Sequence, residues 1–421
     1  MRRTSPMTLV ACRRFAALMS IVASAGACDG DPASEATETS HRDSAGIEIV
    51  SIAVDAPGAV WMRPDTANGL RIGTLDGPEP TRFGEVLGLV TRADGGVIVA
   101  DVQTRELRAF DAAGTHLWTA GGIGDGPGEF AGIGAVGPFR GDSVVVFDNR
   151  ADRLTFVGVD GVIGRSAPLE WPNRPFGFTS ARDGALLARI FHFPDAGNLP
   201  GEGDDGAFRR DSVNFRWATP EADTGPALPG PIPDMEALVR VEGQEGMINV
   251  MALPSPWSRY AYATAAPGGA WVAVSDRFEL LGYDLAGNLV RIVRAPGFDL
   301  TFTNDIVADT RDALLADAAD TPAARRQVEN RIELTPRPTT LPAFSALQVD
   351  AAGRLWVLSW HPGDAPPERA WVFESDGTFL GRVDLPLGVR LHAADVDAIW
   401  GVELDELDVP SVVRYPLISP E

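Results

Sequence analysis

Residues 91–122 read TRADGGVIVADVQTRELRAFDAAGTHLWTAGG, and residues 140–169 follow the same plan as RGDSVVVFDNRADRLTFVGVDGVIGRSAPL. Each stretch has a turn, a strand that ends in Asp, a short polar turn, a second strand, an acidic turn with Gly and a third strand. β-Branched and aromatic residues that alternate between Gly, Asp and Pro turns are typical of strands. The two stretches therefore predict a repeat made of short strands.

The spacing of the turns is the same in three copies of this repeat. Gly95 and Gly114 are 19 positions apart, and the same 19 positions separate the matching turns of two other copies, Asp142 to Gly161 and Gly268 to Gly287. Two looser copies have a longer turn between their strands and begin at Asp183 and Ala352. A period of about 40 to 50 residues with four strands is typical of propeller blades.

The two ends of the chain supply the last blade. Residues 396–417 contain two strands, and residues 46–54 and 69–75 contain strands without a complete unit of their own. Pairing the two ends in one sheet would close the ring and remove exposed edges. We therefore predict an all-β, six-bladed β-propeller over residues 45–421.

One stretch departs from the strand pattern. Residues 303–334, TNDIVADTRDALLADAADTPAARRQVENRIEL, are rich in Ala, Asp and Arg, with apolar residues at helical spacing. Thr303 or Asn304 can cap the start of a helix. We predict a small helical insertion near 303–333, which acts either as a lid or brace on the sheet edges or as a docking element for a partner.

The first 44 residues have the features of an exported protein. Basic residues are followed by an apolar stretch from Phe15 to Ala27, and small residues lie just before Cys28. This is typical of a secretory signal, and the segment around Cys28 resembles the lipobox of bacterial lipoproteins, in which that Cys is acylated. We predict a signal peptide over 1–27, lipidation at Cys28 and a flexible, acidic tether over 28–44. Ordinary cleavage after Ala27 is the alternative.

The charge of the chain restricts its partners. The formal net charge is −22, and all 36 basic residues are Arg. Such a field repels phosphate backbones and anionic lipid surfaces. We therefore expect no nucleic-acid partner, membrane contact through the lipid anchor only, and a location in the bacterial cell envelope.

Three segments carry a resemblance to known proteins. FDAAG at 110–114 and GGIGDGPGEF at 121–130 resemble the linkers of NHL-type six-bladed propellers, and the ending GVELDELDVPSVVRYPL resembles that of bacterial propeller lipoproteins, many without known function. The resemblance covers roughly residues 45–421. The resemblance implies the propeller architecture. It does not imply an activity, because propellers host binding, scaffolding and several unrelated chemistries.

The candidate binding residues follow from the order of strands in a blade. Strands run from the axis to the rim, so the connections between second and third strands lie on the same face as those between blades; we name it the b–c face. Asp and Arg side chains recur there, and two Trp flanked by Pro or His turns are candidates for its central mouth. The predicted ligand-binding residues are Asp101, Arg105, Asp125, Glu129, Asp148, Arg153, Trp257, Asp276, Arg277 and Trp360. The alternative is that each Asp and Arg braces its own turn.

Several functions are compatible with these residues. The five His are scattered and Cys28 is the only Cys outside the signal, so we predict no transition-metal site. A calcium site in the loop of Asp125 and Glu129 is an alternative to a plain turn. The preferred hypothesis is a binding or scaffold lipoprotein that recognises a protein, peptide or glycan. The alternatives are a metal-assisted hydrolase or lyase at the axial mouth, lactonase-like or amidating-lyase-like, and a structural subunit of an envelope complex.

Overall fold

The computed structural model describes residues 39–52, 59–192, 206–244, 247–363 and 365–420. The predicted signal peptide, Cys28 and the first part of the predicted tether lie outside the described residues. None of the described helices has both the length and the apolar character needed to cross a membrane.

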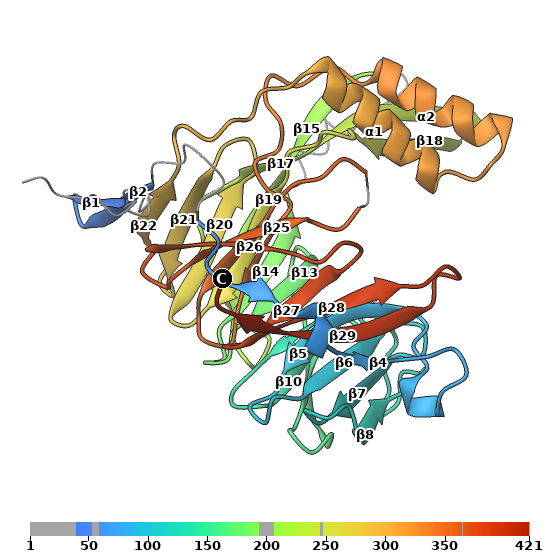
Figure 1. Cartoon of the computed structure of the whole chain (residues 1–421), viewed down its shortest axis with the longest axis vertical. Coiled ribbons are helices and arrows are strands. Elements are labelled where there is room, and N and C mark those ends of the chain that lie inside the picture. Colours follow the sequence, from blue (N-terminus) through green and yellow to red (C-terminus); the bar gives the residue numbers. More distant parts are fainter. Residues whose placement is uncertain (1–38, 53–58, 193–205, 245–246, 364, 421) are drawn as a thin grey trace, which may run out of the picture. The chain divides into compact units, whose positions relative to one another are not determined.

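The described residues form six sheets that radiate from a common axis (Figure 1). Blade 1 contains β5 (Val86–Thr91), β6 (Val97–Asp101), β7 (Glu106–Phe110) and β8 (His116–Gly121). Blade 2 contains β9 (Ala135–Pro138), β10 (Val144–Asp148), β11 (Arg153–Val157) and β12 (Ile163–Pro168). Blade 3 contains β13 (Pro175–Ser180), β14 (Leu186–Phe191), β15 (Phe208–Ala218), β17 (Ile232–Gln244) and β18 (Met247–Pro254), with β16 (Thr224–Ala227) paired to β15.

The second half of the chain forms the other three blades. Blade 4 contains β19 (Ala261–Ala266), β20 (Gly269–Val274), β21 (Glu279–Asp284) and β22 (Leu289–Arg294). Blade 5 contains β23 (Ala346–Val349), β24 (Leu355–Leu358), β25 (Arg369–Phe373) and β26 (Phe379–Asp384). Blade 6 contains β27 (Arg390–Ala394), β28 (Ala398–Leu404) and β29 (Pro410–Ile418), completed by β3 (Arg63–Pro64) and β4 (Leu70–Ile72).

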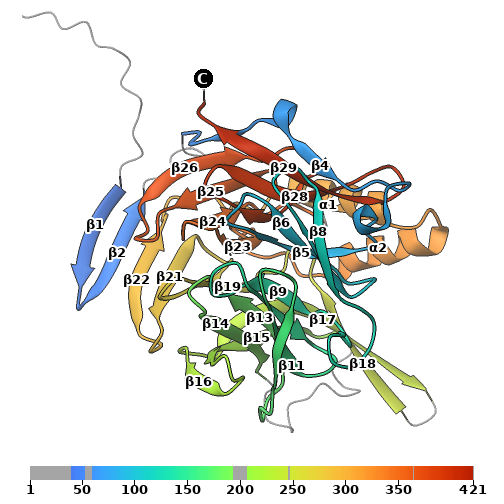
Figure 2. The same ribbon diagram turned by 90° about the horizontal axis from the view of Figure 1, so that it is seen from below.

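The first strand of each blade lies at the axis. In order around the axis, β5, β9, β13, β19, β23 and β27 each neighbour the next, and β27 neighbours β5 again. Figure 2 shows the inner strands β5, β9, β13, β19 and β23 gathered near the centre, with strands such as β11, β22 and β26 farther out. This arrangement confirms the predicted all-β propeller.

The predicted turns have the backbone that the repeat requires. Gly95 and Gly114 both have φ of +80°, which glycine adopts at little cost. The apolar faces of adjacent blades then pack together to form the core. Between blades 4 and 5, for example, the ring of Phe278 meets that of Trp371 edge to face, with centroids 5.6 Å apart.

The two ends of the chain close the ring in part as predicted. β29 pairs with β28 on one side and with β3 and β4 on the other, so the C-terminal strand joins N-terminal strands in blade 6. Residues 46–54 were predicted to form a strand of this closing sheet; the strand is present as residues 47–52, but its predicted position was wrong. β2 (Ile47–Ile52) pairs in parallel with β22 on the outer edge of blade 4, because Val50 and Ile52 are buried there and Glu48 bonds to Arg291 at 2.7 Å.

The last part of the predicted tether, residues 39–44, is a strand. These residues form β1 (Thr39–Ser44), which pairs with β2 in a hairpin. Its side chains are almost all exposed, so the polar composition that suggested a flexible segment reflects an edge strand with little to bury.

The helical insertion is confirmed as two helices between blades 4 and 5. α1 (Asn304–Asp317) begins after Thr303, whose hydroxyl accepts from the Ile306 amide at 3.4 Å. α2 (Pro322–Leu334) begins after Thr321, which caps it in the same way. Two threonines at N-cap positions thus end the irregular segments and start both helices.

Candidate functional site

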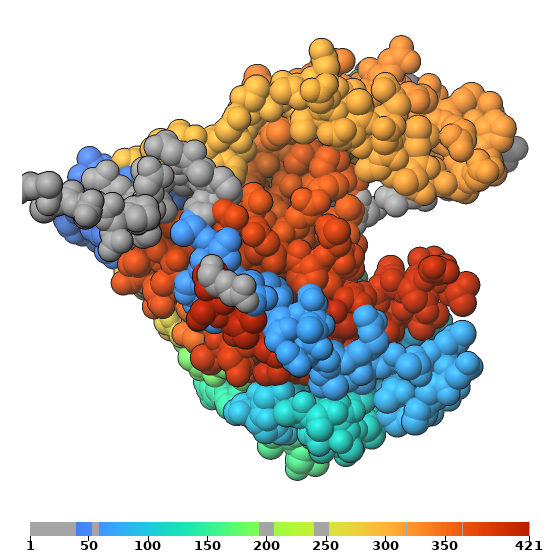
Figure 3. All heavy atoms as spheres, in the orientation of Figure 1, coloured from blue at the N-terminus to red at the C-terminus, as the bar shows by residue number. Residues whose placement is uncertain are grey.

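The largest recess at the axis lies on the b–c face and has a volume of about 580 Å³. Residues before or at the start of β19, β23 and β27 form its floor, and residues 254–258 and the loop after β24 form its walls. Leu314 of α1 and Arg331 of α2 line it from the helical insertion. We name it the axial recess. In the space-filling view the molecule is hollowed between the helices and the C-terminal strands (Figure 3).

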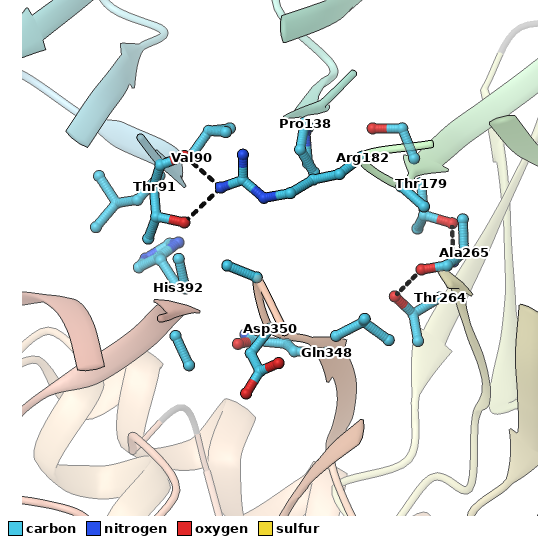
Figure 4. Close-up of a pocket in the computed structure, with 18 of the residues that line it drawn as sticks. Val90, Thr91, Pro138, Thr179, Arg182, Thr264, Ala265, Gln348, Asp350 and His392 are labelled. Carbon is cyan, nitrogen blue, oxygen red and sulfur yellow. Dashed lines mark hydrogen bonds between the residues drawn. The ribbon is translucent and has the colours of Figure 1, made fainter. Parts of the chain in front are cut away.

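A smaller chamber of about 220 Å³ lies at the opposite end of the axis (Figure 4). Its lining includes residues from all six inner strands, and Arg182 crosses it to bond Thr91 Oγ1 at 2.7 Å. Gln348 and His392 line both the chamber and the recess, so they lie between the two. Gln348 Nε2 donates to Leu391 O at 3.1 Å, while its Oε1 is buried and has no hydrogen-bond partner among the described residues.

Two tyrosines project from the start of β19 into the recess. Tyr260 and Tyr262 are two positions apart, so their side chains lie on the same face of the strand, with ring centroids 6.1 Å apart. Burial raises the pKa of both phenols, and for Tyr260 the nearby Arg331 acts against that rise. Both hydroxyls are therefore protonated at neutral pH and can donate hydrogen bonds.

Two tryptophans that the sequence assigned to the mouth have different positions. Trp360 lines the recess and packs against the cluster that holds the helices. Trp257 is fully buried: its Nε1 donates to Thr310 Oγ1 at 2.9 Å, and its ring packs against Phe302 at 5.1 Å. The prediction for Trp257 is corrected, because it anchors the helical insertion and has no surface for a ligand.

The charged side chains of the recess are basic. Arg331, Arg390, His361 and His392 line it, and no Asp or Glu is among its described lining residues. Arg331 Nε and Nη2 donate to Pro254 O at 3.2 and 2.8 Å, and no Asp or Glu in the described part of the chain forms an ion pair with this guanidinium. Burial, with help from Arg390, lowers the pKa of His392 to about 4, so this imidazole is neutral at pH 7.

The repeated aspartates at the ends of β6 and β10 are fully buried and bonded to the backbone. Asp148 accepts from the amides of Ala131 and Gly132 at 2.9 Å and from Ala151 at 3.0 Å. Asp101 accepts from Gly84 at 2.9 Å and from Gln103 at 3.0 Å in the same manner. These carboxylates hold the start of the inner strand and the next turn together, and they present no surface to a ligand.

The predicted arginines of blades 1 and 2 hold the linker between these blades. Arg153 Nη2 lies 3.2 Å from Asp148 Oδ2 and donates to Glu129 O at 2.7 Å. Arg105 Nη1 donates to Phe130 O at 3.4 Å. In the linker itself, Asp125 is exposed, and exposed Glu129 accepts from the Gly126 amide at 2.9 Å.

The last predicted pair lies in a separate groove. Asp276 and Arg277 line an open groove of about 860 Å³ between blade 4 and the segment that leads to α1. Arg277 Nε lies 3.2 Å from Asp276 Oδ1, and Arg210 Nη1 lies 3.5 Å from Oδ2 of the same carboxylate. Of the ten predicted residues, only Trp360 lines the axial recess.

The site residues that the sequence did not reveal lie at the starts of inner strands. Tyr260 and Tyr262 occupy this place in blade 4, and Arg390 and His392 occupy it in blade 6. A comparison of strand starts between copies would have found an aromatic pair and a basic pair where other blades have different residues. Arg331 has no such signal, because its position depends on how α2 folds back over the axis.

The described residues were also compared with the requirements of a metal site. Within residues that the structure describes, no three His, Cys, Asp or Glu side chains gather so that they could hold a metal ion. The loop of Asp125 and Glu129, for which calcium was the alternative, has the bonds of a turn given above.

Comparisons with known proteins add the following. No family model matches the chain, and no curated protein matches it. Among solved structures, it is similar to a member of the DUF4221 family from Bacteroides vulgatus, at 12% identity and a TM-score of 0.47, over 85% of this chain and 97% of that one. It is also similar to virginiamycin B lyase from Staphylococcus aureus, at 14% identity and a TM-score of 0.38, over 83% and 99% of the two chains. A third similar structure is a gluconolactonase from Xanthomonas campestris, at 15% identity and a TM-score of 0.37, over 86% of this chain and 99% of that one. These similarities say nothing about the activity or ligand of this chain.

Proposed function

We propose that the protein is an envelope-anchored binding protein that takes one end of a glycan or peptide into the axial recess. The observation that carries the proposal is the recess itself. Its volume of about 580 Å³ lies within the range of about 300–1,000 Å³ that is usual for organic ligands. Aromatic rings and a few convergent polar groups line it, which is the usual composition of such sites.

The polar groups are placed to orient a ligand. The Tyr260 and Tyr262 hydroxyls remain donors at neutral pH, and Gln348 offers an acceptor at the base of the recess. A buried acceptor without a partner costs stability unless a ligand or water satisfies it. Trp360 supplies an apolar wall that is held by its contacts with the helix-bearing cluster.

Anchoring through Cys28 is the second part of the proposal. The small residues before Cys28 and the absence of another Cys after the signal support it. Cys28→Ser should abolish labelling by a clickable fatty acid and release the protein from the membrane fraction. If the variant stays in the membrane fraction and retains the label, the anchor is not at Cys28.

Binding is tested on arrays of glycans and peptides with the purified protein. We expect bound probes that Trp360→Ala releases and that Trp171→Ala retains. Trp171 is a matched control because it is also a half-buried tryptophan, but it lines a different pocket, formed by the link between blades 2 and 3 and by strands of blade 3. Probes that bind Trp360→Ala as well as the unchanged protein would place the ligand outside the recess.

A further inference from the structure

We infer that the ligand of the axial recess is a sugar that carries a carboxylate, such as a uronic acid at the end of a glycan chain. This inference rests on the proposed function and names the chemical class that the recess selects. It follows from three features of the recess: its charge, the way one arginine is held, and the arrangement of its aromatic rings.

The charge of the recess is opposite to that of the whole chain. The chain has 58 acidic and 36 basic residues, yet the described lining contains two arginines and no carboxylate. A carboxylate that enters the recess therefore meets the guanidinium of Arg331, while Glu368, an acid beside the recess, lies 3.6 Å from His361. A cationic ligand would instead be attracted to the rest of the surface.

Arg331 differs from the arginines near the other b–c turns in its partners. Arg153 lies 3.2 Å from Asp148, and Arg277 lies 3.2 Å from Asp276, so the charge of each has a carboxylate beside it. Arg331 is held instead by two bonds to the Pro254 carbonyl. Its guanidinium is fixed in place and keeps its full charge for an anion. An arginine held in this way binds a carboxylate with good geometry and little entropy cost.

The neutral groups around Arg331 suit a hydroxylated ring. Trp360, Tyr260 and Tyr262 offer aromatic surface, and the face of a pyranose ring packs well on such surface. Tyrosine hydroxyls donate and Gln348 Oε1 accepts, so sugar hydroxyls can act in both directions. Neutral His392 can add a donor or an acceptor without adding charge.

The test is calorimetric titration of the full-length protein with trigalacturonic acid and with its fully methyl-esterified form. Oligomers of glucuronic, mannuronic and guluronic acid extend the panel, and trialanine with a free or amidated C-terminus represents peptides. The variants are Arg331→Gln, Arg390→Gln and Trp360→Ala. Arg326→Gln is the control, because Arg326 is exposed on the same helix and does not line the recess.

We expect at least one uronate to bind, and its ester to bind at least tenfold more weakly. Arg331→Gln should weaken the acid about tenfold and leave the ester unchanged, whereas Arg326→Gln should change neither. If Arg331→Gln fails to fold, Arg390→Gln tests the same charge dependence from blade 6.

Other results separate this inference from the proposed function. If acid and ester bind equally and Trp360→Ala abolishes both, the recess is the site but the carboxylate inference is wrong. Binding of trialanine alone, or of no uronate in the panel, also overturns the inference. Uronate binding that neither Trp360→Ala nor the arginine variants alter would contradict both the inference and the site.

Discussion

The b–c turns of blades 1 and 2 and the axial recess lie on the same face of the propeller but differ in how their polar groups are used. In the turns, Asp101 and Asp148 are buried and bonded to backbone amides, and Arg153 is paired with a carboxylate and a carbonyl. In the recess, and among the residues that the structure describes, Gln348 has an acceptor without a partner and Arg331 pairs with no carboxylate.

This difference separates residues that build the fold from residues that can act on a ligand. A motif that recurs in successive blades has a structural role that every blade needs. It supplies hydrogen-bond acceptors for the backbone amides where an inner strand starts. The recess is built from residues that do not recur, together with a helical insertion that interrupts the repeat. Departures from the repeat, rather than the repeat itself, therefore indicate the candidate site.

The largest effect should come from a repeated turn. Asp148→Ala would remove a buried carboxylate and leave several amides and Arg153 without their acceptor. We expect a loss of about 3–5 kcal/mol in the free energy of unfolding, measured by urea denaturation, with ligand affinity unchanged in the folded protein. Asp160→Ala, in an exposed turn, should cost far less. A stable Asp148→Ala variant with weakened binding would show that the repeated turns bind the ligand and do not stabilise the fold.

The anchor of the helical insertion should affect stability and binding together. Trp257→Ala would leave a cavity beneath α1 and α2, at a cost of about 3 kcal/mol. Because both helices contribute to the recess, ligand affinity should fall as well. Trp257→Phe keeps most of the packing and loses the bond to Thr310, so it should cost about 1 kcal/mol. Unchanged affinity in Trp257→Ala would show that the helices do not contribute to the site.

A smaller effect should appear as a dependence of stability on pH. The pKa of His392 is about 4 in the folded protein, against about 6.5 in the unfolded chain. Between these values the unfolded state binds the proton and the folded state does not, so stability falls as the pH falls. The unchanged protein should lose about 1–2 kcal/mol more than His392→Gln between pH 7 and pH 5. Equal losses in the two proteins would show that His392 is not held neutral.

The smallest effect should come from the arginine that the repeat aligns. Arg153→Ala removes an ion pair in which Asp148 is fully buried, and one hydrogen bond to the linker. Because Asp148 keeps its backbone amide donors, we expect a cost of only about 1 kcal/mol. Binding in the axial recess should not change. Affinity is measured for Arg153→Ala and Arg331→Gln in parallel. A large loss of affinity in Arg153→Ala would show that the ligand binds at the repeated Asp and Arg residues.

The sequence predicted the propeller because its blades repeat local patterns: alternating apolar residues, turn glycines such as Gly95, and caps such as Thr303. It could not place β2, whose parallel pairing with β22 joins segments about 240 positions apart. It also misplaced Trp257, since Pro and Ser neighbours suggest an exposed loop while burial depends on helices far along the chain. The recess was missed because its residues come from four blades and the insertion, and only the folded chain brings them together.

Hydrogen exchange with and without a bound uronate oligomer tests the central claim most directly, since it reports on both regions in one experiment. We predict slower exchange in residues 254–262, in α2 and in residues 388–392, and no change in residues 101–106 and 148–153. Slower exchange confined to residues 101–106 and 148–153, with the recess unaffected, would contradict the account.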